Sequence, residues 1–224
     1  MEMRAFRRAV DDSFHYEEFH CEEFISGIGP METAFSLTSR LSRGTSDLRA
    51  VLHFGIAGAY HRPHAAGAGI LDICLATEEI FADMGICHGD GIEHFAASEL
   101  GARNCFSLNS GLLQEAAGLL AAENITARQG RFLTVSCVSG TRKRGDMLAE
   151  MFDGLCENME GAAVARVCEA FALPCLELRC ISNFVEDRNS DNWRLKEACR
   201  RAGATAALLA QTLNPEPETR NPRP

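Results

Sequence analysis

Two short segments of this sequence carry the side chains best suited to chemistry: residues 158–163 (NMEGAA) and residues 182–188 (SNFVEDR). The first places the Glu160 carboxylate where a helix is predicted to begin, and its two oxygens could accept hydrogen bonds from two neighbouring hydroxyl groups. The second places the Asn183 amide directly after an apolar run. Taken alone, Glu160 could be an ordinary first-turn acid, and Asn183 could be a turn residue.

Two further segments, residues 55–59 (GIAGA) and 136–141 (SCVSGT), also follow apolar runs. The small residues Ala57 and Gly58 would let the backbone approach a ligand closely. Val138 is a candidate to line the same pocket, with a place in the core as the alternative. In open α/β sheets, ligands bind where the carboxyl ends of the strands meet, so these segments together predict one site.

The elements that must position these segments alternate along the chain. Short apolar runs rich in β-branched residues are separated by stretches with helical spacing, which predicts an α/β fold with parallel strand pairing. Residues 214–224 (NPEPETRNPRP) predict a disordered tail, so one domain is expected over residues 1–213. The predicted strands are 50–56, 69–76, 131–138 and 175–181, and the predicted helices are 112–123, 162–172 and 193–213.

The composition excludes several classes of partner. The 224 residues carry a net charge of −9, whereas a protein that binds the phosphate backbone of a nucleic acid needs a basic face. No stretch reaches the roughly 18 apolar residues that would span a bilayer. The first twenty residues are charged throughout and hold no apolar core of a secretory signal, so we expect a cytoplasmic protein without membrane partners.

The ten cysteines fit that expectation. No CxxC pair occurs, and a chain of this length does not need disulfides to fold. We expect reduced thiols that pack as small hydrophobic side chains inside apolar segments. The clearest examples are Cys74, Cys137, Cys168, Cys175 and Cys180.

Two polar clusters are set aside. His61 and His64 (HRPH) have no third ligand nearby, so a metal site is not predicted. Residues 88–94 (HGDGIEH) are expected to form a solvated loop. The basic run at residues 142–144 is interpreted as the exposed start of a helix.

Longer motifs carry a resemblance. ENMEGAAVARVC and LPCLELRCISNFVEDR, with SGIGPMETA and HFGIAGAY upstream, resemble the nucleoside phosphorylase-like superfamily. Within it they resemble the hydrolytic branch that includes methylthioadenosine/S-adenosylhomocysteine nucleosidase and futalosine hydrolase. The resemblance covers roughly residues 1–213 and implies a three-layer α/β fold with a central mixed sheet. The strand that should precede the start is absent from the sequence, so the fold is expected to lack its first strand unless the given start is incomplete.

The resemblance implies roles for the polar segments. Glu160 would bind both ribose hydroxyls and Met159 would cover the sugar. Asn183 would face the leaving base, and Ser182 belongs to the same substrate-binding motif. The adenine-specific nucleosidases have aspartate where Asn183 stands. An amide NH₂ can donate to the O6 and N7 acceptors of a 6-oxopurine, which favours hypoxanthine or guanine.

The remaining roles follow the same register. Glu2 aligns with the glutamate that activates the attacking water. His53 and Ile56 stand where related phosphorylases have an arginine and a hydroxyl residue for phosphate, which favours water as nucleophile. Arg188 and Trp193 make the last segment more similar to futalosine hydrolase, whose substrate carries a benzoate-bearing tail.

The sequence therefore predicts an N-glycosyl hydrolase acting on a small purine nucleoside, with hypoxanthine as the leaving base. No cofactor and no metal are implied, and the resemblance implies a homo-oligomer. Two alternatives stay open: a phosphorylase of 6-oxopurine nucleosides, which Asn183 permits, and a nucleoside-binding module without catalysis.

Overall fold

The computed structural model of the chain describes residues 1, 4, 7–8, 21–62, 67–88, 91–95 and 101–213. Glu2, His64 and the predicted tail lie outside the described residues. The strands are β1 (Val51–Ala59), β2 (Ile73–Phe81), β3 (Gly85–His88), β4 (Gly91–His94), β5 (Cys105–Ser107), β6 (Ala127–Thr134), β7 (Gly154–Asn158) and β8 (Cys175–Phe184). The helices are α2 (Pro30–Leu41), α4 (Ser110–Ala122), α5 (Arg142–Phe152), α6 (Gly161–Ala170) and α7 (Leu195–Thr212), with a 3₁₀ turn at Ser190–Asn192.

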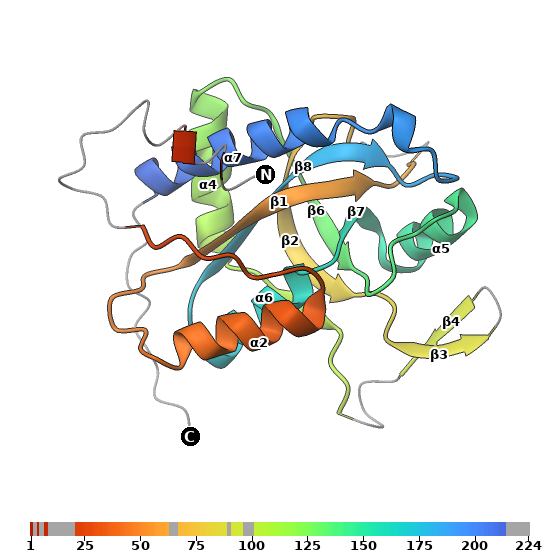
Figure 1. Cartoon of the computed structure of the whole chain (residues 1–224), viewed down its shortest axis with the longest axis horizontal. Coiled ribbons are helices and arrows are strands. Elements are labelled where there is room, and N and C mark those ends of the chain that lie inside the picture. The colour runs from red at the N-terminus through yellow and green to blue at the C-terminus, as the bar shows by residue number, and fades with distance from the viewer. Residues whose placement is uncertain are drawn as a thin grey trace.

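The main sheet is mixed and closes on itself. Its order is β5-β2-β6-β7-β1-β8, and an additional pairing joins β2 to β8 (Figure 1). The pairs β1–β8, β2–β6 and β6–β7 are parallel, as the alternation of strands and helices predicted. The pairs β1–β7 and β2–β8 are antiparallel, because β1 and β8 run against β2, β6 and β7 and closure creates two such seams. The predicted mixed α/β sheet is therefore confirmed, in a form that curls into a barrel.

Strand β1 is paired unevenly. Along one edge it pairs with β8 from Val51 to Ala59, but along the other edge it pairs with β7 only at Gly58 and Ala59. Among the described strands, none covers the remainder of that second edge.

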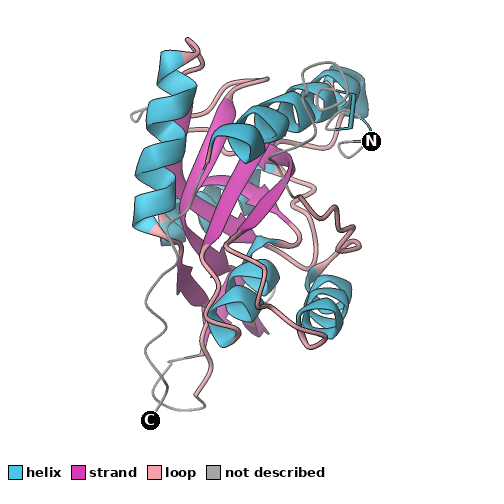
Figure 2. Cartoon of the chain, turned by 90° about the vertical axis from the view of Figure 1, so that its left-hand side faces the viewer, coloured by secondary structure: helices cyan, strands magenta, loops and turns pink. Residues whose placement is uncertain are grey.

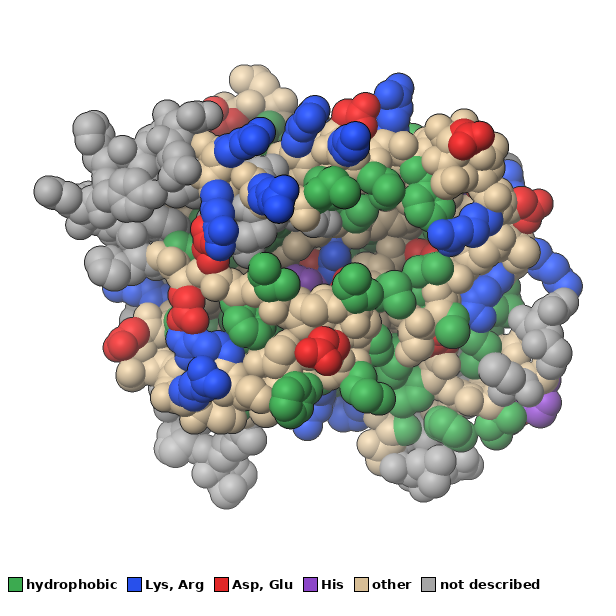
Figure 3. Space-filling view, viewed as in Figure 1, with side chains coloured by type: hydrophobic (Ala, Val, Ile, Leu, Met, Phe, Trp, Pro, Cys, Tyr) green, Lys and Arg blue, Asp and Glu red, His purple; other side chains and the backbone are tan. Residues whose placement is uncertain are grey.

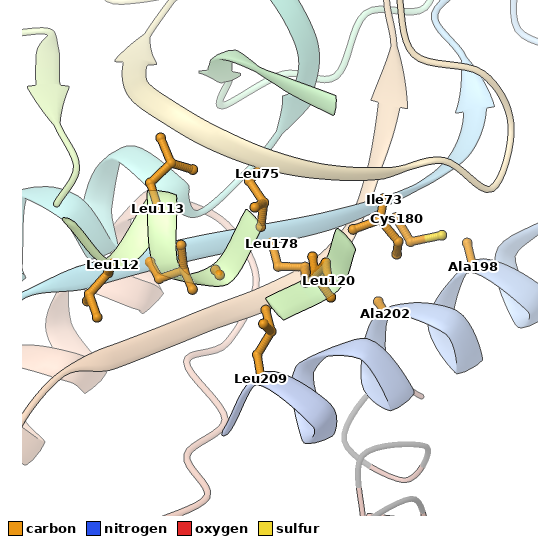
Figure 4. Close-up of a cluster of buried hydrophobic side chains, with 12 residues drawn as sticks. Ile73, Leu75, Leu112, Leu113, Leu120, Leu178, Cys180, Ala198, Ala202 and Leu209 are labelled. Carbon is orange, nitrogen blue, oxygen red and sulfur yellow. The ribbon is translucent and has the colours of Figure 1, made fainter. Parts of the chain in front are cut away.

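Helices cover the barrel on opposite sides, which gives the expected three layers (Figure 2). On one side, α4 and α7 pack against β2 and β8 around Leu75, Leu120, Leu178 and Leu209, all of which are fully buried (Figure 4). On the other side, α2 packs against α6 through a second cluster. No helix among the described residues is long and apolar enough to cross a bilayer.

Two predicted strands have different ends in the structure. Strand β2 begins at Ile73 because the preceding residues form a turn in which Leu71 has a φ of 66°. Strand β6 ends at Thr134, since the N–H groups of Ser136 and Cys137 donate to the Asp83 carboxylate instead of to a neighbouring strand.

Two other predictions need correction. Cys137 was expected to be buried in an apolar strand, but its position beyond the end of β6 leaves it exposed, whereas Cys74, Cys168, Cys175 and Cys180 are buried. The segment expected to be a solvated loop instead contributes β3 and β4, which pair as an antiparallel hairpin. Backbone hydrogen bonds pair these two strands, and the polar side chains of the segment did not indicate that pairing.

The core packing gives a first prediction. Leu178→Ala should lower the free energy of unfolding by about 2–5 kcal/mol, because it opens a cavity between β8 and its helices. Met151→Ala, at a side chain that is 46% exposed, should change it by no more than about 0.5 kcal/mol. Urea unfolding of both variants measures the difference, and equal stabilities would contradict this description of the core.

Candidate active site

One layer of side chains inside the barrel is charged. Glu177 and Arg179 lie at alternate positions of β8 and point into the barrel, whereas Leu178 between them points to the helices. Arg179 Nε donates to Glu177 Oε1 at 2.8 Å, and the Arg179 side chain is only 4% exposed. The guanidinium crosses over Gly55 of β1, where an added Cβ would lie 2.6 Å from Nη1. A buried cation is tolerated here because carboxylates surround it.

Glu79 of β2 completes this buried group. Gly161, the first residue of α6, lies against the Glu79 and Glu177 carboxyls so closely that an added Cβ would overlap both. Burial and the neighbouring Glu177 hold the pKa of Glu79 well above its usual range. Burial opposes ionisation of Glu177 as well, but Arg179 and His53 outweigh it and bring the pKa of Glu177 to about 2. Burial and Glu177 thus favour the protonated form of Glu79, whereas Arg179 and His53 favour the ionised form of Glu177.

Asn158 connects the buried acids to the start of α6. Its Nδ2 donates to Glu79 Oε1 at 2.6 Å, and its Oδ1 accepts from the N–H groups of Glu160 and Gly161 at 2.8 and 2.7 Å. Thr134 Oγ1 donates to Glu79 Oε2 and accepts from Ala162 N–H at 2.8 Å. Three N–H groups at the helix start are thus satisfied by side chains of the sheet, which fixes the direction of the Glu160 side chain.

The Glu160 carboxylate stands at the edge of this network. Its side chain is 15% exposed, and Oε2 lies 3.5 Å from Arg179 Nη2. Oε1 accepts from the backbone N–H of Gly29 at 3.2 Å. Gly29 has a φ of 84°, which favours glycine, and directly precedes α2. The SGIGP turn was recognised in the sequence, but its contact with Glu160 was not predicted.

Asn183 lies four residues beyond Arg179 on the same strand. Ser182 Oγ donates to Asn183 Oδ1 at 2.8 Å and also contacts the carbonyl oxygen of Ala57 at 3.2 Å. Asn183 Nδ2 donates to the carbonyl oxygen of Phe184 at 2.9 Å, so one of its two N–H groups is left for a ligand. A Cβ at Gly58 would lie 3.2 Å from Nδ2, so this glycine keeps the space beside the amide open. The structure thus brings Ala57, Gly58, Ser182 and Asn183 together.

Sequence reasoning missed Glu157, which faces the same glycine from the other side. Gly58 pairs with Glu157 on β7 and with Asn183 on β8. Glu157 accepts from Ser139 N–H and Ser139 Oγ at 2.8 and 2.7 Å and from Tyr60 Oη at 3.1 Å. Burial raises its pKa, although these hydrogen bonds oppose the rise. Glu157 is the first residue of the ENMEGAAVARVC motif, but it was not singled out, because an acid within a strand is ordinarily a solvated side chain.

The other predicted binding residues lie further out. Val138 is 45% exposed, and Met159 is half-buried beside Glu160. The guanidinium of Arg188 lies 4.8 Å from the centroid of the Trp193 ring, so these two residues are together, although both are outside the buried group.

Several hollows mark the surface of the described residues. Near the middle of the face seen in Figure 1, Figure 3 shows a hollow with a histidine and charged side chains at its floor. A cavity of about 460 Å³ lies beyond it, where Tyr60, His61 and Phe184 form part of the wall, and one of about 860 Å³ lies along α5. Neither cavity is lined by Glu160 or Arg179.

Metal ligands do not gather within the described part of the chain. There, no group of three or more histidine, cysteine, aspartate and glutamate side chains is placed to hold a metal ion. His61 instead stacks on Phe184, with 4.7 Å between the ring centroids.

Comparison with known proteins gives consistent relatives. The profile of the Phosphorylase superfamily matches residues 24–213. A futalosine hydrolase of Thermus thermophilus is 35% identical over 190 residues, which is 83% of this chain and 80% of the relative. A futalosine hydrolase of Streptomyces coelicolor is 34% identical over 192 residues, which is 84% of this chain and 77% of the relative.

A solved structure supports the fold. The native structure of futalosine hydrolase of Helicobacter pylori superposes with a TM-score of 0.73 at 21% identity, and the match covers 84% of this chain and 78% of that one.

The buried acids give a prediction about pH. The raised pKa of Glu79 means that the unfolded chain releases this proton from about pH 4.5 upward while the folded chain retains it. The wild type should therefore lose stability relative to Glu79→Gln as pH rises, by up to about 1.4 kcal/mol per pH unit until the folded pKa is reached. Denaturant unfolding between pH 5 and pH 8 measures the slope.

Glu79→Ala is the matched control, since it also removes the titrating group. The difference in free energy of unfolding between Glu79→Ala and the wild type should change with pH at the same slope. The Glu79→Ala variant should be less stable than Glu79→Gln at every pH, because Thr134 and Asn158 lose their acceptor. A difference that does not change with pH would show that Glu79 is ionised in the folded protein.

Proposed function

The chain belongs to the phosphorylase superfamily, and we propose that it cleaves the N-glycosidic bond of futalosine with water, releasing hypoxanthine and dehypoxanthine futalosine. It is an N-glycosyl hydrolase, as its relatives at 34–35% identity are. The single observation that supports the assignment best is the position of Glu160 beside the buried Arg179, where Asn158 and Gly29 hold it.

Glu160 is proposed to hold the ribose. One carboxylate with two oxygens can accept from two vicinal hydroxyls, and the half-buried Met159 beside it would cover the sugar. As the bond to the base breaks, positive charge develops on the ribose ring. A carboxylate held in a fixed direction stabilises that charge more than it stabilises the ground state.

Asn183 is proposed to stabilise the departing base. Its one uncommitted N–H can donate to an acceptor of hypoxanthine, while Ser182 and Phe184 fix the amide plane. An amide does not supply a proton, so the base leaves through hydrogen bonding to its developing negative charge. Gly58 and Ala57 would let the purine approach the backbone, with Val138 at the rim.

Water is the proposed nucleophile. Ile56 offers phosphate no hydrogen bond, and His53 is already engaged with Glu177 and Arg179. The alternative of a 6-oxopurine phosphorylase is therefore disfavoured, in line with the names of the relatives. Glu2 is retained as a proposed base for the water from the resemblance, and it lies outside the described residues.

The remaining proposals concern the substrate tail, the pathway and the oligomeric state. Arg188 and Trp193 are proposed to meet the carboxylate and ring of the futalosine tail. The product would enter a route to menaquinone in the cytoplasm, and the protein would act as a homo-oligomer.

The direct test is incubation with futalosine in phosphate-free buffer. Free hypoxanthine without phosphate is the expected result. Release only when phosphate is added would establish a phosphorylase, and binding without release in either buffer would establish a module without catalysis.

Glu160→Gln should lower kcat/KM for futalosine by about 10²–10³-fold, because the amide loses the charge that stabilises the ribose cation. Glu169→Gln, on the exposed side of α6 in a pair with Arg103, is the matched control and should retain wild-type kcat/KM. Steady-state rates of hypoxanthine release compare the two. Equal losses would contradict a specific role for Glu160.

Asn183→Asp should change the preferred base. A carboxylate repels the O6 and N7 acceptors of hypoxanthine, so kcat/KM for futalosine should fall at least about tenfold. The 6-amino analogue of futalosine presents a donor at this position, so its kcat/KM should fall less. The ratio of the two kcat/KM values reports the change, and an unaltered ratio would mean that Asn183 does not face the base.

A further inference from the structure

The cavity of about 460 Å³ lies at the end of the barrel where β1 and β8 finish and β2 and β6 begin. Its wall includes residues that follow β1, residues of the turn before β2, and the first residue of α5. Because its charged side chains are mostly basic, we call it the basic cavity. Its volume falls in the range of pockets that hold small molecules.

The lining is positive in a protein whose net charge is −9. It contains three arginines, Arg62, Arg128 and Arg142, but one acid, Asp72. That acid is already bound, since Asp72 Oδ2 accepts from the N–H of Gly69 at 2.9 Å and from Arg128 Nε at 3.4 Å. A ligand that complements this lining is therefore an anion.

The guanidiniums of the lining have donors to spare. Arg62 Nη2 pairs with Asp153, and Arg142 Nε lies 3.3 Å from Asp146 Oδ2, but neither acid lines the cavity. Within the part of the chain that the structure describes, each of the two, like Arg128, engages a carboxylate through one nitrogen. A guanidinium has five N–H donors, so the others can form the paired hydrogen bonds that bind a carboxylate or a phosphate.

Aromatic rings form another part of the wall. The rings of His61 and Phe184 are stacked, with 4.7 Å between their centroids and 22° between their planes. The almost fully buried Tyr60 lines the same cavity. A planar ring packs well against such a wall, whereas an inorganic anion would leave it uncovered. The combination of rings and guanidiniums favours an aromatic ligand that carries a carboxylate.

We propose that the basic cavity is a second binding site, which takes a small aromatic carboxylate. The carboxylate lies among the arginines, and the ring packs against His61 and Phe184. Since neither Glu160 nor Arg179 lines the cavity, this site is separate from the one proposed to hold the ribose.

The second site adjoins the residues proposed to meet the base. The carbonyl oxygen of Phe184 accepts from Asn183 Nδ2 at 2.9 Å, and Tyr60 Oη donates to Glu157 at 3.1 Å. Asn183 and Glu157 both pair with Gly58, from opposite sides. A ligand in the cavity thus contacts one hydrogen-bond partner of each side chain.

This ligand chemistry has two sources: a free aromatic acid, or the benzoate-bearing tail of futalosine. The second source rests on the proposed function and would replace Arg188 and Trp193 as partners of the tail. Binding of a free aromatic acid requires no hydrolysis, so the site can be tested even if the proposed function fails.

The test is calorimetric titration of the full chain with benzoate, and with benzamide as the uncharged analogue. Benzoate should bind at least about tenfold more tightly than benzamide, and Arg62→Gln and Arg128→Gln should each weaken benzoate binding about tenfold. Arg103→Gln is the matched control, because Arg103 pairs with Glu169 at the surface and does not line the cavity. It should bind benzoate as the wild type does.

Three outcomes would overturn the proposal: no benzoate binding by the folded wild type, equal affinity for benzamide, or wild-type affinity in both Arg62→Gln and Arg128→Gln. Arg188→Gln is titrated in parallel. Loss of binding in that variant alone would place benzoate beside Trp193 instead, which also overturns the proposal.

Kinetics with futalosine then separate the two sources. If the tail occupies the cavity, Arg128→Gln should raise KM for futalosine about tenfold with little change in kcat, and benzoate should inhibit competitively. If a free acid is the ligand, KM should stay at the wild-type value and benzoate should change kcat. A wild type that binds benzoate but does not cleave futalosine supports the second site and contradicts the proposed function.

Discussion

The positive charge of Arg179 inside the barrel is the constraint on which the rest of the site depends. A guanidinium that is 4% exposed can remain there only with anions and acceptors on every side. Glu177 supplies the close ion pair, Asn158 supplies a carbonyl, and Glu160 supplies the outer charge. Glu79 adds little negative charge to the sealed part of the network, because burial and Glu177 raise its pKa. The charge available to a ligand is concentrated at the rim, on Glu160.

The charged groups also require glycine at two neighbouring positions. Gly55 leaves room for the guanidinium to cross β1, and Gly161 leaves room for two carboxyls under the start of α6. The helix can then begin directly over the acids, and its first N–H groups bind Asn158 and Thr134. The packing of the acids, the start of α6 and the Glu160 carboxylate are consequently one unit, so a change in any member would move Glu160.

The sequence singles out Glu160 and Asn183 as candidates because they lie in unusual motifs, NMEG and ISN, and the structure places Glu160 beside Arg179. The alternation of strands and helices likewise predicted the parallel pairs. Glu79 and Glu157 could not be predicted, because an acid within a strand is by pattern a solvated side chain, and only closure of the sheet buries it. Closure itself depends on β2 meeting β8, a long-range contact with no local signature. The sequence also could not show that one N–H group of Asn183 donates to the carbonyl oxygen of Phe184.

The pairing of β1 with β8 has a consequence for how the protein is made. Strand β1 ends at Ala59, but its partner begins only at Cys175, so the ring cannot close until most of the chain has left the ribosome. Proteins dominated by such distant contacts fold slowly, because long loops must be ordered before the contacts form. During synthesis β1 is an apolar strand without its partner, exposed to neighbouring chains. The arrangement that builds the candidate site therefore leaves β1 without its main partner until β8 has been made.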